Sequence, residues 1–267
     1  VTKEVFQSGN EPTQIDTLFK SFQINRETGQ LATIFTPPQL IEERVYMVVP
    51  PHAMAWARQV GLPTLPNSYD TVIAQSYGSD GAKIIQPSMF TNVSGQVSIR
   101  GTAFGDDFAY YRLLVGKGLD PQQWIQVGSE VSSPVKSGVL GYWDTSGLSG
   151  LYVLQLQVVH QNGDVETAMV QVTVDNQPPS LEIRYPHEDQ TIQRSEEAYI
   201  AFQVDASDNM ELSVVKFFLD GHLIESLTSS PFIVPWTAEI GEHQLQVQAL
   251  DRAGNVSEDR VQFTVER

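Results

Sequence analysis

The chain has 267 residues, of which 41% are hydrophobic, and this is enough for about two domains with ordinary buried cores. Its formal net charge is −16, from 32 acidic and 16 basic side chains. Because phosphate groups bind to basic surfaces, this balance excludes nucleic acid and anionic lipid as expected partners.

The absence of cysteine excludes disulfides and thiolate metal sites, and it suits an extracytoplasmic bacterial setting. No apolar run reaches the roughly 18 residues that a membrane span requires, so we expect no membrane contact by this chain itself. The chain starts at Val1 with neither a methionine nor a basic-then-apolar leader. We interpret it as part of a longer protein whose membrane anchor lies upstream.

Residues 1–78 carry little periodic apolar sequence. Alternating residues at 19–24 and 31–34 flank a turn at 25–29, which predicts a small hairpin. Pro37 and Pro38 predict the start of a short helix that runs to Glu43. A second helix is predicted at 52–60, with Gly61 as its left-handed stop. The rest of this region is expected to be extended.

From Ile84 onward the pattern becomes that of short strands separated by turns at intervals of roughly 8–12 residues. Trp124 and Trp143 are large enough to start a core. No long 3.6-residue period interrupts this pattern, which argues against an α/β enzyme. The expected strands of this part lie at 97–103, 109–115, 181–184, 199–204, 214–219 and 222–227.

One 25-residue passage occurs twice. Residues 150–174 align without a gap to 241–265, a shift of 91 residues, and ten of the 25 positions are identical. Each copy reads as an alternating strand, a glycine-centred turn and a second alternating strand. This is typical of the closing hairpin of a β-sandwich of about a hundred residues. The two-residue period predicts that certain apolar residues face inward: Leu154, Leu156 and Val158 in the first copy, and Leu245, Val247 and Ala249 in the second. The glutamines between them are predicted to face outward: Gln155, Gln157, Gln246 and Gln248.

The predicted fold is therefore mainly β: two tandem immunoglobulin-like β-sandwiches after a mixed, mostly extended N-terminal segment. We expect a linker segment at 1–78, a first sandwich at 79–176 and a second at 177–267. Because prolines fix φ and lack an amide donor, Pro178 and Pro179 predict a short, stiff joint that holds the sandwiches end to end.

The N-terminal segment resembles the stretch that follows the transpeptidase domain of class A (bifunctional) penicillin-binding proteins. The resemblance rests on Phe6-Gln-Ser-Gly9-Asn10-Glu11-Pro12-Thr13 and on Ile24-Asn25-Arg26-Glu-Thr-Gly29-Gln-Leu31-Ala32-Thr33. It covers about 65 residues. Some bacterial members of that family carry immunoglobulin-like or fibronectin-III-like extensions, which the tandem sandwiches resemble. The resemblance implies a parent that is a peptidoglycan glycosyltransferase and transpeptidase, with this chain as its extracytoplasmic C-terminal tail.

Short strings that match transpeptidase motifs occur in the chain, but in the wrong order. Ser133 and Lys136 fit S-x-x-K, yet Ser133 precedes a proline in a predicted loop. Ser213 and Lys216 fit the same motif, but at i and i+3 of a strand they point to opposite faces. Ser8-Gly9-Asn10 fits S-x-N in isolation. We therefore expect no catalytic residue, no cofactor and no enzyme activity in this chain.

Calcium is the one metal that the sequence suggests. Hard oxygen ligands gather where the sandwiches should meet, at Asp175, Asp205, Asp208 and Asp251. No D-x-D-x-D-G array is present, and Asp is also an ordinary turn residue. The five histidines show no metal spacing.

Aromatic residues of the first sandwich suggest a face for stacking on sugar rings. The candidate glycan contacts are Tyr110, Tyr111, Trp124, Tyr142 and Trp143. Because Tyr110 and Tyr111 are adjacent on a strand, only one of them can face the core. The alternative is that most of these rings fill the core.

The predicted function is a non-catalytic region that positions a penicillin-binding protein in the wall or contacts wall or protein partners. A peptidoglycan-binding carbohydrate module is one alternative, and a purely structural spacer is another. In each case the expected location is extracytoplasmic, with the parent anchored to the cytoplasmic membrane.

Overall fold

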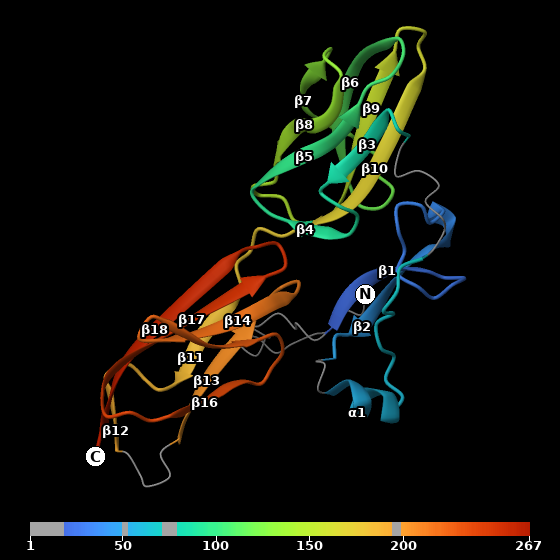
Figure 1. Ribbon diagram of the computed structural model, residues 1–267. Coiled ribbons are helices and arrows are strands. Elements are labelled where there is room, and N and C mark those ends of the chain that lie inside the picture. Colours follow the sequence, from blue (N-terminus) through green and yellow to red (C-terminus); the bar gives the residue numbers. More distant parts are fainter. Residues whose placement is uncertain (1–18, 50–52, 71–78, 194–198) are drawn as a thin grey trace, which may run out of the picture.

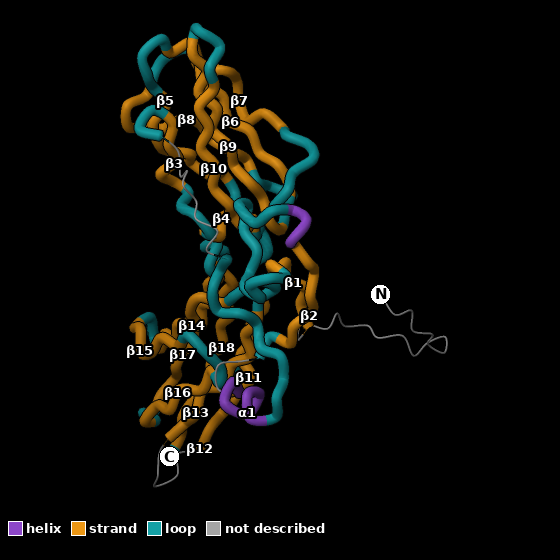
Figure 2. The backbone as a smooth tube through the Cα atoms, turned by 90° about the vertical axis from the view of Figure 1, so that its right-hand side faces the viewer, coloured by secondary structure: helices purple, strands orange, loops and turns teal. Residues whose placement is uncertain are grey.

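Two β-sandwiches lie end to end in the computed structural model, and a smaller N-terminal unit lies beside the place where they meet (Figure 1). The structure describes residues 19–49, 53–70, 79–193 and 199–267. A view turned by 90° shows the same order, with strands in both sandwiches and helix only in the N-terminal unit (Figure 2). The predicted mainly-β class is confirmed. None of the described helices has the length and apolar content needed to cross a membrane.

The first sandwich packs a three-stranded sheet on a five-stranded sheet. The sheet orders are β3-β5-β8 and β4-β10-β9-β6-β7. Its strands are β3 (Ala82–Gln86), β4 (Thr91–Val93), β5 (Gln96–Ala103), β6 (Phe108–Lys117), β7 (Ile125–Val131), β8 (Val135–Asp144), β9 (Gly150–His160) and β10 (Val165–Val174).

The second sandwich repeats this arrangement strand for strand, with sheet orders β11-β13-β16 and β12-β18-β17-β14-β15. Its strands are β11 (Ser180–Tyr185), β12 (Gln190–Gln193), β13 (Tyr199–Ser207), β14 (Leu212–Leu219), β15 (His222–Leu227), β16 (Phe232–Thr237), β17 (Gly241–Asp251) and β18 (Val256–Glu266).

Each sandwich begins with two consecutive strands that belong to different sheets, and this makes the topology immunoglobulin-like. β3 pairs with β5 in one sheet, and β4 then crosses over to run parallel to β10 in the other. β11 and β12 do the same against β13 and β18. The remaining pairings are antiparallel, as expected for a sandwich of this class.

The repeated passage forms the central hairpin of each five-stranded sheet. β9 pairs with β10, and β17 pairs with β18, both antiparallel. The predicted inward residues are fully buried, whereas the glutamines between them are partly exposed, so the predicted two-residue alternation is confirmed. The buried residues are Leu154, Leu156 and Val158 in the first copy and Leu245, Val247 and Ala249 in the second.

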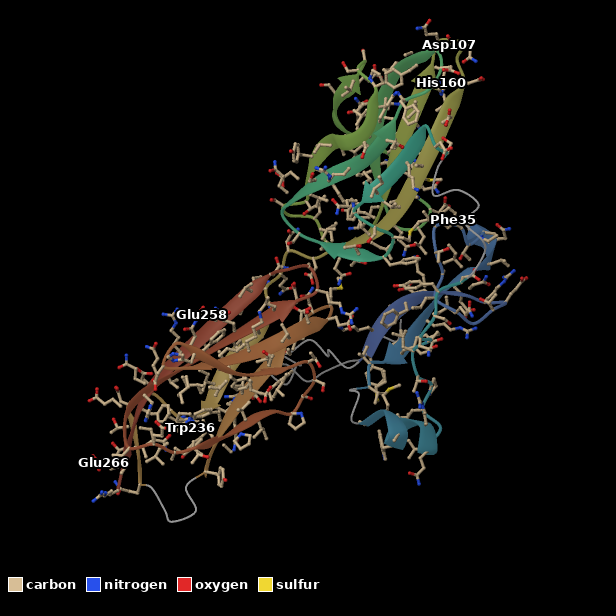
Figure 3. All side chains as sticks on the ribbon, viewed as in Figure 1. Phe35, Asp107, His160, Trp236, Glu258 and Glu266 are labelled. Carbon is tan, nitrogen blue, oxygen red and sulfur yellow. The ribbon has the colours of Figure 1, made fainter. Side chains whose placement is uncertain are left out.

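Each sandwich has its own core. In the first, Trp143 packs edge-on against Tyr152. In the second, the rings of Phe202, Trp236 and Phe263 pack against one another, and Phe217 is fully buried. Figure 3 shows Trp236 in the second sandwich and His160 at the far end of the first.

The N-terminal unit (residues 19–70) corrects two predictions. β1 (Phe19–Asn25) pairs with β2 (Ile41–Met47), not with residues 31–34, of which only Leu31 forms an isolated bridge to Ile24. The helix expected after Pro37 is a single 3-10 turn, η1 (Pro38–Leu40). The stretch from Ile41 forms a strand and does not continue the helix, because it pairs with β1.

The other predicted helix is present. α1 spans Met54–Gln59, and Gly61 follows it with a positive φ of 73°. A left-handed residue of this kind is the usual way to end a helix, and glycine adopts it without steric cost. The passage Phe6–Thr13 and the string Ser8-Gly9-Asn10 lie outside the described residues.

Candidate functional site

Three carboxylates converge where the two sandwiches meet. Asp175, Asp208 and Asp251 each place a carboxylate oxygen so that all three oxygens lie within 4.8 Å of one another. Among the described residues, this is the one place where three or more His, Cys, Asp or Glu side chains gather in this way. We call these residues the junction triad.

Three separate connections supply the junction triad. Asp175 directly follows β10, Asp208 directly follows β13, and Asp251 is the last residue of β17. Asp205, the fourth calcium candidate of the sequence, does not join them. It lies within β13, not in a loop as expected, and its exposed carboxylate pairs with Arg184 at 2.7 Å.

Two residues of the junction triad are buried in spite of their charge, and Asp208 is half-buried. Asp175 is 2% exposed and Asp251 is 3% exposed. Asn255 donates to both carboxylate oxygens of Asp251, from its backbone amide at 2.8 Å and from its side chain at 2.6 Å. Asp175 Oδ2 and Asp208 Oδ1, in contrast, are buried oxygens without a hydrogen-bond partner. Such orphaned acceptors are rare in folded proteins.

The electrostatics of the junction triad are those of a site that lacks positive charge. Burial raises the pKa of Asp208, and the negative charges of Asp175 and Asp251 raise that pKa further. No ion pair between described residues involves any of the three carboxylates. The nearby Arg252 is paired with Glu211 at 2.8 Å.

Neutral hydrogen bonds join the sandwiches around the junction triad. Asn255 donates to the carbonyl of Asp175 at 2.8 Å, and Ser94 donates to the carbonyl of Ala253 at 2.9 Å. On the other side, the Asn176 side chain accepts from the Gly95 amide at 2.8 Å and donates to the Thr145 carbonyl at 2.7 Å. The joint is therefore held by side chains of both sandwiches as well as by its prolines.

The N-terminal unit contacts both sandwiches beside this joint. Lys20 Nζ donates to the carbonyl of Asn209 at 2.7 Å, and the Ile34 amide donates to the buried side chain of Gln171 at 3.2 Å. The ring of Tyr69 stacks on Phe90 with centroids 3.9 Å apart. Inside the unit, the buried Asp70 accepts from Asn25 at 2.6 Å.

The aromatic candidates do not form one sugar-binding face. Tyr111 and Trp143 are 3% and 4% exposed, and the Tyr111 hydroxyl donates to the buried carbonyl of Leu140, so both are corrected to core residues. Trp124, Tyr142 and the half-buried Tyr110 remain accessible. Tyr142 belongs to β8 and Tyr110 to β6, on the outer faces of opposite sheets.

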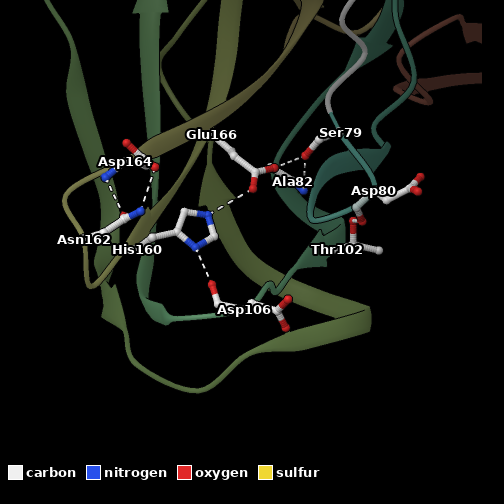
Figure 4. A network of polar contacts seen from close by, with 9 residues as sticks. All are labelled: Ser79, Asp80, Ala82, Thr102, Asp106, His160, Asn162, Asp164 and Glu166. Carbon is white, nitrogen blue, oxygen red and sulfur yellow. Dashed lines mark hydrogen bonds and ion pairs between the residues drawn. The ribbon is translucent and has the colours of Figure 1, made fainter.

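The serine strings have no catalytic geometry. Ser133 lies in the loop before β8, and both Ser213 and Lys216 lie in β14. Another serine, Ser79, takes part in the polar network at the far end of the first sandwich (Figure 4). There Glu166 stands between Ser79 and His160, accepting from Ser79 and bonding His160 Nε2 at 3.0 Å.

This network does not have the order that nucleophilic catalysis needs. A serine nucleophile is activated when a base such as histidine takes its proton. Here His160 does not contact Ser79, and its other nitrogen lies 2.9 Å from the carbonyl of Asp106. His160 is also only 9% exposed. The network connects Ser79, which lies just before β3, to the β9–β10 hairpin of the same sandwich.

The sequence suggested Asp175, Asp208 and Asp251 at the junction, but it did not separate them from Asp205. The 91-residue shift contains a signal that would have helped, because it aligns Asp251 with His160. Both residues end the equivalent strand of their sandwich, β17 and β9. The same place in the fold thus carries a hydrogen-bonded histidine in one sandwich and a carboxylate of the junction triad in the other.

A sequence family matches part of the second sandwich, and the chain has distant likenesses among solved structures. Among solved structures, the fibronectin(III)-like modules of Clostridium thermocellum CbhA are 19% identical, with a TM-score of 0.47 over 69% of this chain and 93% of theirs. Murine CEACAM1b is 11% identical, with a TM-score of 0.37 over 68% of this chain and 98% of its own. No curated protein matches the sequence. The sequence family described as a bacterial Ig domain matches residues 179–247, which lie within the second sandwich.

Proposed function

We propose that this chain is a non-catalytic spacing arm that lies outside the cytoplasmic membrane and positions a peptidoglycan glycosyltransferase and transpeptidase of the class A penicillin-binding type. The arrangement at the joint is the observation that carries the spacing role. Asn255 and Ser94 bind the sandwiches to each other, Asn176 fastens the joint to the first sandwich, and the N-terminal unit contacts both. An arm built in this way transmits position, which a flexible linker does not.

The proposed parent rests on the resemblance of residues 24–33. In the structure this passage is ordered: Asn25 ends β1 and bonds Asp70, and Thr28 lies 3.4 Å from the same carboxylate. The passage thus belongs to the small N-terminal unit, which contacts both sandwiches of the arm. A unit of this kind is suited to fix the direction in which the arm leaves an upstream catalytic domain.

Peptidoglycan binding is the second candidate function. It is favoured by the exposed rings of Trp124 and Tyr142, 37% and 57% exposed, because flat rings stack on sugar faces. Trp124 lies in the loop before β7, whereas Tyr142 lies on β8 in the other sheet, so each ring would act alone. The spacing role needs no such contact.

A domain exchange in the parent protein separates the two functions. Residues 79–267 are replaced by two unrelated immunoglobulin-like domains of the same length, and growth of a strain that depends on the parent is measured. A deletion of the same residues is the control and is expected to impair growth. For a spacing arm, the exchanged protein restores growth. Failure of the exchange, with the Trp124→Ala and Tyr142→Ala variants also failing, would contradict spacing and favour binding to the wall.

A further inference from the structure

We infer that the junction triad binds one calcium ion, which fastens the second sandwich to the end of the first. The carboxylates of Asp175, Asp208 and Asp251 are the ligands. Calcium takes six to eight oxygen ligands, and carboxylates from separate loops are a common source of them. Each of the three side chains offers one carboxylate oxygen to the common centre, and water fills the remaining positions.

Two unpartnered oxygens point to a ligand and not merely to a cluster of acids. Asp175 is 2% exposed, and its Oδ2 has no hydrogen-bond partner. Asp208 Oδ1 is in the same state, and both residues belong to the group whose oxygens lie within 4.8 Å. A buried, unpaired carboxylate oxygen is costly, and a cation held between the three side chains removes that cost.

Within the part of the chain that the structure describes, no basic side chain forms an ion pair with the junction triad. Lys20 is committed to the carbonyls of Asn209 and Met210, and Arg252 is committed to Glu211. The fold itself does not require acids at this place, because the first sandwich has His160 where the second has Asp251. That histidine is held by Glu166 and by the carbonyl of Asp106.

The chemistry of the three side chains determines which class of metal ion they bind best. All the donors are carboxylate oxygens, with no imidazole or thiolate, so a hard cation is favoured over zinc or copper. Magnesium demands a near-ideal octahedron and keeps several waters, whereas calcium accepts irregular cages of carboxylates. Ligands from three loops with different hydrogen-bond restraints form an irregular cage.

The ion deepens the spacing role, because Asp175 belongs to the joint while Asp208 and Asp251 belong to the second sandwich. Calcium therefore adds a cross-link to the hydrogen bonds of Asn255. Binding is nevertheless testable apart from that role: calorimetry reports on the ion whether or not the parent needs a spacer. The domain exchange in turn gives its answer without reference to calcium.

The test is calorimetric titration of the full chain with calcium chloride after treatment with a chelator. We expect one site with a dissociation constant below about 1 mM and binding of magnesium at least roughly tenfold weaker. Asp208→Asn and Asp251→Asn should each weaken calcium binding at least tenfold. Asp205→Asn is the matched control and should bind as the unaltered protein does, because Asp205 is exposed and paired with Arg184.

Thermal unfolding gives the second readout. Calcium should raise the unfolding temperature of the unaltered protein and of Asp205→Asn, but not that of Asp208→Asn. In calcium-free buffer, Asp208→Asn should unfold at the same or a higher temperature than the unaltered protein, because it removes a repelling charge. Absence of calcium binding by the unaltered protein at about 5 mM, well above the range of extracellular calcium modules, would overturn the inference. Calcium binding retained in both Asp208→Asn and Asp251→Asn would overturn it as well.

Discussion

Replacing Phe217 by alanine is expected to destabilise the second sandwich by about 3–5 kcal/mol. Phe217 is fully buried on β14 and belongs to the core that Phe202, Leu245 and Phe263 also form. Truncation removes the transfer energy of the ring and leaves a cavity, because strands on both sides fix the walls. Of the substitutions considered, this one has the largest expected effect on stability.

The neighbouring Phe218 provides a matched control, since it has the same side chain on the same strand. Phe218 points the other way, is partly exposed and lies outside the core. Urea unfolding followed by tryptophan fluorescence measures both variants, because Trp236 packs against the same core. Equal losses for Phe217→Ala and Phe218→Ala would show that the assigned faces of β14 are wrong.

Replacing Gly101 by alanine is expected to cost about 1–3 kcal/mol or more in the first sandwich. An added Cβ would stand 1.9 Å from the carbonyl oxygen of Lys83 on the paired strand β3. The obstacle is backbone, so a side-chain rotation cannot relieve it, and the β3–β5 pairing must shift. The cause is the close approach of β3 and β5 beside an irregularity in their register, which lies between Ile84 and Gln86.

Gly138, the pairing partner of Gly101 on β8, is the control for this substitution. A Cβ at Gly138 meets only a side-chain methyl of Val135, at 3.3 Å. Gly138→Ala should therefore change the free energy of unfolding by much less than Gly101→Ala. If the two variants unfold at the same urea concentration, the close approach of β3 and β5 is not present in solution.

The sandwiches were predictable because their sequence signal is local. A two-residue period predicts which face of a strand is buried, and the duplicated passage located the central hairpin in both sandwiches. The strands β7, β8 and β16 were not predicted, and neither were β4 and β12, which are only three and four residues long. Their parallel pairing with β10 and β18 depends on partners about eighty residues away.

The N-terminal unit was harder to predict for a related reason. The residues at 31–34 alternate as a strand would, but β1 pairs with the more distant 41–47. The turn predicted at 25–29 therefore led to the wrong partner strand for β1.

The junction triad falls between these cases. Residue type and position at loop ends suggested Asp175, Asp208 and Asp251, and the topology of the sandwich brings them together. Asp205, three residues before Asp208, has the same chemistry but lies within β13 and pairs with Arg184 on β11. Only the position of the strand end separates the two aspartates. The sequence pattern did not fix that position to within three residues.

The end-to-end arrangement of the sandwiches is the central claim, and small-angle X-ray scattering of the full chain tests it most directly. A strand of eleven residues, such as β9 or β17, spans roughly 37 Å, so two sandwiches in line reach at least roughly 74 Å. A compact chain of 267 residues would have a radius of gyration of about 18 Å. We expect a radius clearly above that value and a distance distribution with a long tail. A radius near 18 Å with a symmetric distribution would contradict the arm.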